Sequence, residues 1–140
     1  MPTKKANAIW KGDLKSGNGT MKVGSGAYEG AYSFATRFED KEGSNPEELI
    51  GAALAGCFSM ALSNELDKAG FTPNSVETSA DVTIDPGAGA ITTIKLVTKG
   101  DVSDIENEKF QEIAKAAKSG CPVSKALTGV DIQLDATLIS

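Results

Sequence analysis

The sequence predicts an α+β fold in a single domain over residues 1–140. Segments with apolar residues at alternate positions, typical of strands, lie near both ends of the chain. Between them, Asn45 opens a long apolar segment that carries the signals of a helix start, and a second segment with helical spacing follows residue 104. The resulting order of strands, helix, strands, helices and strand is that of an α+β protein.

The first part of the chain is expected to form three antiparallel strands. These strands cover residues 5–11, 20–24 and 31–38, and Asn18-Gly19 is a candidate for a type I′ turn between the first two. Gly30 separates the second strand from the third.

A long helix is expected over residues 46–68. Asn45 is its N-cap, Pro46 occupies the first helical position, and Glu48 stands at the reciprocal capping position. Residues 49–62 are apolar all round, which indicates a helix buried on every side, so a chain of this size needs a second copy to cover it. Small residues allow two such helices to approach closely across a dimer axis: Gly51, Ala52, Ala53, Ala55, Gly56 and Ala61.

Alternation of apolar residues predicts strands on both sides of a second helical region. A hairpin is expected from residues 75–85 and 90–99, followed by an amphipathic helix over 105–118 that Asp101 or Asp104 opens. A short helix then begins at Pro122 with Cys121 at its cap, and a last strand covers residues 130–138.

Composition excludes several functional classes. Of the 140 residues, 40% are hydrophobic and 24% charged, and the formal net charge is −5. This charge repels phosphate backbones and anionic lipid surfaces, so we expect no nucleic-acid partner and no membrane partner. No stretch reaches the roughly 18 apolar residues of a membrane span, and the N-terminus lacks the apolar core of a signal peptide. We therefore expect a cytoplasmic protein.

The residue types present narrow the chemistry further. The chain has no histidine, which removes Ser-His-Asp and Cys-His hydrolases and most transition-metal sites. Its two cysteines are too few for the disulfide framework of a small secreted domain or for a structural zinc site. We expect no metal and no cofactor.

Cys57 and Cys121 are the candidate redox residues. Taken alone, Cys57 in the middle of an apolar helix is a core cysteine, and a reactive thiolate there needs an external cation because apolar burial raises the pKa of a thiol. Cys121 has the stronger local case, since Pro122 after it marks a helix start, where the partial positive charge favours a thiolate. A simple capping role for Cys121 is the alternative. Local electrostatics thus favour Cys121 as the nucleophile and Cys57 as its partner.

Two charged residues are candidates for activating a thiolate. Arg37 is the only arginine among 14 cationic residues, and its planar guanidinium suits a permanent charge in a semi-apolar site. A surface ion pair with Glu39 explains Arg37 equally well. Glu47 has a local explanation in its favourable position near the start of a helix.

Three segments carry a further signal: residues 44–63 read SNPEELIGAALAGCFSMALS, residues 32–39 read YSFATRFE, and residues 121–127 read CPVSKAL. Together they resemble the signature of the OsmC/Ohr peroxidases (osmotically inducible protein C and organic hydroperoxide resistance proteins), and specifically the OsmC branch. The resemblance spans essentially the whole chain. It implies antiparallel sheets packed around a long buried central helix in an intertwined homodimer.

The resemblance also implies an activity and its residues. It indicates a cofactor-free peroxidase that reduces organic hydroperoxides, with Cys57 as the peroxidatic and Cys121 as the resolving cysteine. Arg37 and Glu47 match the thiolate-activating arginine of the family and its carboxylate partner. A dithiol, for which the family suggests the lipoyl type, would reopen the disulfide. Apolar residues are available to line an approach for the peroxide: Phe34, Phe38, Ile50, Leu54 and Phe58.

Two other functions fit the same residues. A thiol redox sensor or non-enzymatic stress-response dimer would form the same disulfide with negligible turnover. A structural ligand-binding or interaction dimer would leave both cysteines inert.

Helix geometry adds an expectation about Glu47. Its position and that of Cys57 are ten residues apart along one helix, which gives a rise of about 15 Å. One continuous helix cannot bring these two side chains to one site, so we expect Glu47 to act from the second subunit.

Overall fold

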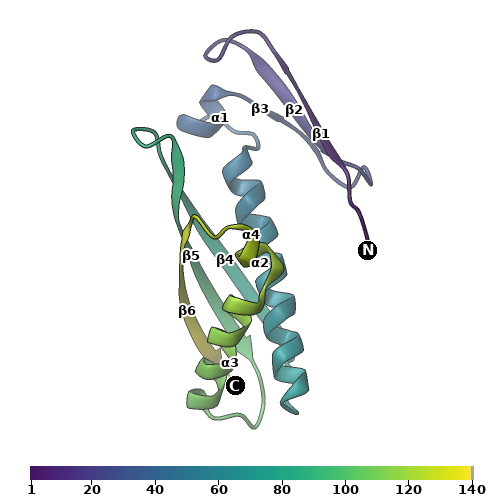
Figure 1. The fold of residues 1–140 in the computed structure, drawn as a ribbon, viewed down its shortest axis with the longest axis vertical. Helices are drawn as coiled ribbons and strands as arrows, with labels where there is room; N and C mark the ends of the chain where they lie inside the picture. The colour runs from purple at the N-terminus through teal and green to yellow at the C-terminus, as the bar shows by residue number, and fades with distance from the viewer. Residues whose placement is uncertain (140) are drawn as a thin grey trace. The chain divides into compact units, whose positions relative to one another are not determined.

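The computed structural model describes residues 1–139, which form two three-stranded sheets and four helices (Figure 1). This architecture confirms the α+β class. The chain divides into two compact units, Met1–Leu49 and Ile50–Ser140. The long helix α2, Pro46–Lys68, begins in the first unit and continues through the second.

The first unit contains an antiparallel meander of β1 (Ala6–Lys11), β2 (Asn18–Val23) and β3 (Glu29–Tyr32). The expected turn at Asn18-Gly19 is wrong, because both residues belong to β2 and pair with Lys11 and Trp10 of β1. Gly19 is required there by packing, since a Cβ would lie 2.7 Å from the Tyr32 ring and 2.8 Å from the Trp10 ring.

The turn between β1 and β2 lies earlier, at residues 12–17. Gly12 has a φ of 95°, and the Asp13 carboxylate accepts a hydrogen bond from the Ser16 N–H at 2.7 Å. The Asp13 carbonyl also accepts from the Gly17 N–H at 3.0 Å. This six-residue turn with its own hydrogen bonds replaces the two-residue turn that the Asn-Gly pair suggested.

The strand expected over 31–38 is also wrong beyond residue 32, because α1 (Phe34–Phe38) follows β3 directly. Ser33 and Thr36 form a capping box in which the Ser33 N–H donates to Thr36 Oγ1 at 2.8 Å and the Thr36 N–H donates to Ser33 Oγ at 3.3 Å. These local bonds stabilise a helical turn over the extended alternative.

Helix α2 has the bounds expected from its capping signals. Asn45 Oδ1 accepts a hydrogen bond from the Glu48 N–H at 2.7 Å, and the Asn45 amide donates to the Glu48 carboxylate at 2.8 Å. The same amide donates to the Thr36 carbonyl at 3.0 Å, which ties the start of α2 to the end of α1. The helix start is therefore fixed by one buried side chain.

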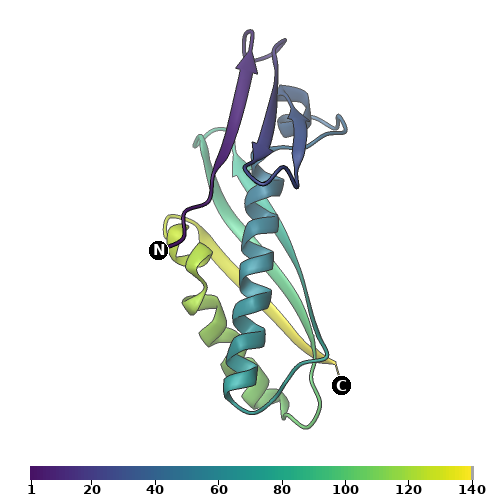
Figure 2. The same ribbon diagram turned by 90° about the vertical axis from the view of Figure 1, so that its right-hand side faces the viewer.

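The second unit is a sheet covered by helices on one face (Figures 1 and 2). The hairpin of β4 (Ser75–Asp85) and β5 (Ala90–Asp101) is confirmed, and β6 (Asp131–Ile139) pairs with β5 in parallel, so that β5 is central. Apolar side chains on the covered face and residues of α2 and α3 make one hydrophobic core. The other face is polar and pairs opposite charges across the strands, as at Glu77 and Lys99.

One face of α2 enters this core. Leu54, Phe58 and Leu62 are fully buried at four-residue spacing, as expected for one stripe of a helix. The opposite face is open, and 78% of Met60 is exposed. The single chain therefore covers only one stripe of α2, with one sheet and one helix, and burial of the remaining faces by a second copy stays a prediction.

By length and composition alone, α2 also meets the requirements of a membrane span, since an 18-residue window has a mean hydropathy of 1.4. The same properties are found in core helices of globular proteins. In this chain Leu54, Phe58, Leu62 and Leu66 of α2 lie in the core described above, whereas Met60 is exposed.

Helix α3 covers Asn107–Gly120 and starts later than the expected 105–118. Asp104, an expected cap, has a φ of 66° and so lacks the extended backbone of an N-cap residue. The preceding loop instead packs inward, since Val102 is fully buried and Ile105 nearly so. The expected inward face of the helix, which includes Phe110, is confirmed.

Candidate active site

Cys57 and Cys121 come together in the second unit. Their Sγ atoms lie 2.7 Å apart, with the Cys121 thiol donating to the Cys57 sulfur, and both cysteines are free. A disulfide bond has a length of about 2.05 Å. The two sulfurs are thus less than 1 Å further apart than in a disulfide, so a small approach of one sulfur to the other would allow the bond to form.

Two different backbone settings deliver the two sulfurs. Cys57 lies in the middle of α2, whereas Cys121 separates α3 from α4 (Pro122–Ala126). The Cys121 N–H donates to the Ala117 carbonyl at 3.0 Å, and its carbonyl accepts from the Lys125 N–H at 3.1 Å. Cys121 thus ends one helix and begins the next, at the expected cap position. Its side chain makes no capping hydrogen bond, because the sulfur turns to Cys57.

The two thiols differ in acidity. Burial raises the pKa of Cys57, and its hydrogen bond with Cys121 raises that pKa further. Burial also opposes ionisation of Cys121, but donors available to its thiolate outweigh burial and hold the Cys121 pKa below its ordinary value: the Cys57 thiol, Ser124 and the Val123 N–H. In the described part of the second unit, Cys121 is therefore the more acidic thiol, as local electrostatics predicted, and the pocket lining beside Cys57 contains no Lys or Arg.

The two thiols also differ in accessibility. Cys121 is fully buried, whereas Cys57 is half-buried and faces a pocket of about 440 Å³. The pocket is lined by Cys57, Met60, Ala61, Asn64, Glu65, Ala117, Gly120 and Pro122. Leu54 and Phe58, which were expected to line an approach to the sulfur, lie instead in the core. No sequence signal pointed to the actual lining residues, because an apolar segment without a stripe does not reveal which face of the helix points inward.

Arg37 and Glu47 form an ion pair in the first unit. Arg37 Nε donates to Glu47 Oε1 at 2.7 Å, and the Arg37 side chain is 36% exposed while that of Glu47 is 8% exposed. The guanidinium also lies 5.2 Å from the centre of the Phe38 ring. The second carboxylate oxygen, Oε2, is buried and has no hydrogen-bond partner within residues 1–139. Arg37 therefore pairs with Glu47 rather than with Glu39, the alternative that the sequence left open.

The expected site residues are present as two pairs. Helix α2 is unbroken between Glu47 and Cys57, so the two residues are about 15 Å apart along its axis. In the described part of the chain, no group of three His, Cys, Asp or Glu residues has the arrangement of a metal site. The chemistry at hand is that of a dithiol and of a separate arginine–carboxylate pair.

Comparison with known proteins identifies the family. The family model described as OsmC-like protein matches residues 39–135. Peroxiredoxin OsmC of Escherichia coli (strain K12) is 51% identical over 140 residues, which cover 98% of this chain and 97% of that protein. Organic hydroperoxide resistance protein OhrB of Bacillus subtilis (strain 168) is 33% identical over 99 residues, with 69% and 72% covered.

A solved structure agrees with this assignment. The crystal structure of the organic hydroperoxide resistance protein OhrB of Bacillus subtilis superposes with a TM-score of 0.71 at 27% identity, and the match covers 95% of this chain and 98% of that one. Since the family model spans more than half of the residues and the Escherichia coli relative is 51% identical over 98% of the chain, the chain belongs to the OsmC family.

Proposed function

We propose that this member of the OsmC family is a thiol-dependent peroxidase that reduces organic hydroperoxides to alcohols in defence against oxidative and osmotic stress. Relatives of the chain carry the names peroxiredoxin and organic hydroperoxide resistance protein. One observation carries the proposal for this chain: two free thiols lie 2.7 Å apart, one facing a pocket and the other buried.

The proposed cycle uses only the two thiols. The Cys57 thiolate attacks the outer oxygen of the peroxide, the O–O bond breaks, and the departing alkoxide takes up a proton to become the alcohol. Cys57 is left as a sulfenic acid. The Cys121 thiolate then attacks the Cys57 sulfur, the S–O bond breaks, and the oxygen leaves as water after protonation. A dithiol, in our proposal of the lipoyl type, reduces the resulting disulfide by exchange.

Accessibility supports Cys57 as the peroxidatic residue. A peroxide can approach the half-buried Cys57 from the pocket, whereas Cys121 has no exposed surface. The lower pKa of Cys121 favours the opposite order. Accessibility decides the order, because a nucleophile must touch its substrate, and because a cation brought to the pocket beside Cys57 would lower the pKa of its thiol.

We propose that Arg37 of a second subunit supplies this cation. A guanidinium beside the Cys57 sulfur would favour its thiolate and stabilise the departing alkoxide. Glu47 fixes the guanidinium through the 2.7 Å hydrogen bond, and its unpartnered Oε2 leaves room for a further donor. The unbroken helix between Glu47 and Cys57 supports a contribution in trans, since one chain separates the two by about 15 Å.

A homodimer would bring these parts together. The open face of α2 presents small residues at which a second helix could approach closely, and a Cβ added to Gly56 would meet no atom within 4 Å. Met60, with 78% of its surface exposed, would be covered by the same contact. We further propose that the enzyme is cytoplasmic, where thiols such as these are kept reduced.

Steady-state turnover tests the proposal. With excess dithiothreitol as the reductant, the protein should consume many equivalents of cumene hydroperoxide per Cys57, and it should prefer cumene hydroperoxide to hydrogen peroxide because the pocket includes apolar side chains. Consumption of a single equivalent, followed by a stable disulfide, would contradict the enzyme and favour a redox sensor.

A further inference from the structure

Ser124 has a buried hydroxyl that the proposed cycle leaves without a role. The residue lies on α4, three positions after Cys121, and its Oγ completes no hydrogen bond of standard geometry within residues 1–139. Buried hydroxyls without a partner are uncommon, because each loses its hydrogen bonds to water. The nearby charge that this donor can serve is a thiolate at Cys121.

The surroundings of Cys121 already favour such a thiolate. Burial alone would raise the pKa of this thiol, yet the pKa lies below its ordinary value because donors surround the ionised sulfur: the Cys57 thiol, the backbone and side chain of Ser124, and the Val123 N–H. Burial and the hydrogen bond with Cys121 have the opposite effect on the pKa of Cys57. In thiol–disulfide exchange, the sulfur with the lower pKa is the better leaving group.

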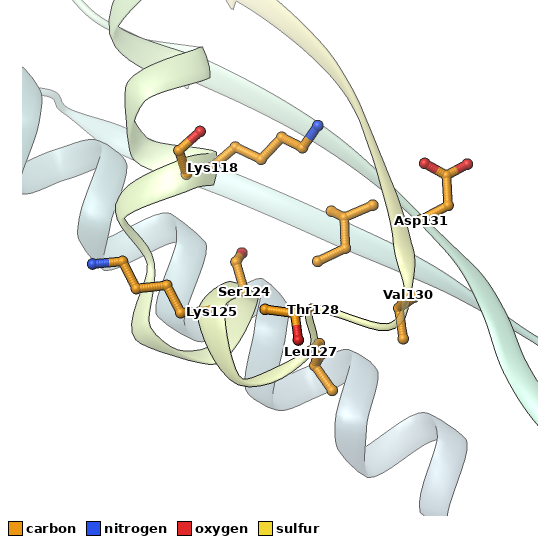
Figure 3. Close-up of a pocket in the computed structure, with 9 residues that line it drawn as sticks. Lys118, Ser124, Lys125, Leu127, Thr128, Val130 and Asp131 are labelled. Carbon is orange, nitrogen blue, oxygen red and sulfur yellow. The ribbon is translucent and has the colours of Figure 1, made fainter.

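Access to the sulfurs points the same way. The Cys57 sulfur borders the 440 Å³ pocket, whereas Cys121 is fully buried. A separate open pocket of about 410 Å³ is lined by Ser124 together with Lys118, Lys125 and Asp131 (Figure 3), but neither cysteine belongs to its lining. A reductant from solution therefore has one sulfur of the disulfide to attack.

We propose that the dithiol reductant attacks the Cys57 sulfur, and that Ser124 is a positioning residue whose hydroxyl donates to the Cys121 sulfur as it leaves. This inference deepens the proposed peroxidase cycle and rests on it. The pocket beside Cys57 then receives the peroxide in one half-reaction and the reductant in the other.

The dithiol reduces the Cys57–Cys121 disulfide in two exchange steps. One thiolate of the reductant forms a bond to the Cys57 sulfur, the Cys57–Cys121 bond breaks, and its electron pair leaves on Cys121, which accepts the Ser124 hydrogen bond. The second thiol of the reductant loses its proton and attacks the reductant's own sulfur in the mixed disulfide. Cys57 then departs as a thiolate. The reductant ends as an intramolecular disulfide, and the protein has gained two electrons, one for each sulfur.

Reduction kinetics of Ser124→Ala test the role of the hydroxyl. The proteins are first converted to the disulfide with cumene hydroperoxide and then reduced with dithiothreitol as the probe. Ser124→Ala should slow the reduction by about fivefold to tenfold, the value of one ordinary hydrogen bond, and shift the equilibrium with dithiothreitol towards the disulfide. Ser124→Thr, which keeps a hydroxyl, should recover most of the rate. Ser119→Ala is the matched control, because Ser119 is exposed and lines the same open pocket.

A spectroscopic readout separates this role from a structural one. In the reduced protein, the thiolate absorbance near 240 nm should appear at higher pH in Ser124→Ala than in the wild type and in Ser124→Thr. Equal reduction rates and equal thiolate titrations in wild type and Ser124→Ala would overturn the proposal.

The site of attack is tested by trapping. Reduction of the wild-type disulfide with the monothiol 2-mercaptoethanol, quenched with acid, should leave the mixed disulfide on Cys57 in peptide mass mapping. A mixed disulfide on Cys121 would overturn the proposal. Failure of cumene hydroperoxide to oxidise the wild type to the Cys57–Cys121 disulfide would contradict the proposed function itself. That failure is distinguishable from failure of the present proposal, because the oxidation is measured before any reductant is added.

Discussion

The Cys57 and Cys121 sulfurs lie 2.7 Å apart, although the residues are 64 positions apart in the chain. One sulfur belongs to the middle of a long helix and the other to the junction of two helices. The pair has an outer member open to a pocket and an inner member without exposed surface. This asymmetry predicts different consequences when either thiol is removed.

Cys57→Ser should abolish peroxide turnover, since the remaining thiol, Cys121, is fully buried and offers the peroxide no exposed surface. Cys121→Ser should still reduce one equivalent of peroxide and should then accumulate Cys57 as sulfenic and sulfinic acid. Single-turnover consumption of cumene hydroperoxide, with mass analysis of Cys57, checks both outcomes. If Cys57→Ser performs the single turnover and Cys121→Ser does not, the order of the two cysteines is the reverse.

Arg37→Ala should lower kcat/KM for cumene hydroperoxide by roughly 100-fold, the usual cost of removing one preorganised donor. It should also move the alkylation of Cys57 by iodoacetamide to higher pH, because a nearby positive charge lowers the pKa of a thiol and its loss raises that pKa. Arg37→Lys should lose much of the activity despite keeping the charge. Lys15→Ala removes a cation from the same unit and should change neither property. An unchanged alkylation profile in Arg37→Ala would exclude arginine from thiolate activation.

Gly56→Glu should convert a stable dimer into a folded monomer. The added side chain meets no atom of its own chain near the Cβ position, so the fold of the chain should survive, whereas a charge on the open face of α2 would oppose a second helix. Sedimentation measures the assembly and circular dichroism the fold. Thr137→Glu is the control, since it adds the same charge on the polar sheet face opposite Lys99. A wild type that sediments as a fully active monomer would defeat this prediction.

Asn45→Ala should lower the free energy of unfolding by about 1 to 2 kcal/mol, because the substitution removes the N-cap of α2. The bond to the Thr36 carbonyl is lost with it. Asn45→Asp keeps the cap acceptor but loses both donors, so it should lie between wild type and Asn45→Ala. Urea denaturation gives these values. A change within experimental error in Asn45→Ala would show that the cap does not limit stability.

Local signals predicted the elements whose stabilising groups are close in sequence. The start of α2 follows from Asn45 and its reciprocal bonds with Glu48, three residues away. The capping box of Ser33 and Thr36 is equally local, but Phe34 and Phe38 also fit an extended reading, and α1 was therefore missed. The Asn18-Gly19 turn failed for a different reason, because pairing with β1 places both residues in β2, and the local bonds of Asp13 then form the turn earlier in the chain.

The site was predictable only in part. Local electrostatics gave the more acidic thiol at Cys121, and helix geometry separated Glu47 from Cys57. The contact between the two cysteines depends on the packing of α3 and α4 against α2, which cannot be read from the spacing of residues along the chain. The expectation that Cys57 and Cys121 form a disulfide came from the family resemblance. The buried Ser124 hydroxyl gave no sequence signal, because a serine near a helix start is commonly exposed.

Mixed dimers test the central claim that Cys57 of one subunit works with Arg37 and Glu47 of the other. A Cys57→Ser protomer and a Glu47→Ala protomer, each with its own affinity tag, are refolded together, and the mixed dimer is isolated through both tags. A site built in trans keeps one intact combination of Cys57 and Glu47, so the mixed dimer should regain about half of the wild-type activity with cumene hydroperoxide. Activity no higher than that of the Glu47→Ala parent would contradict the shared site.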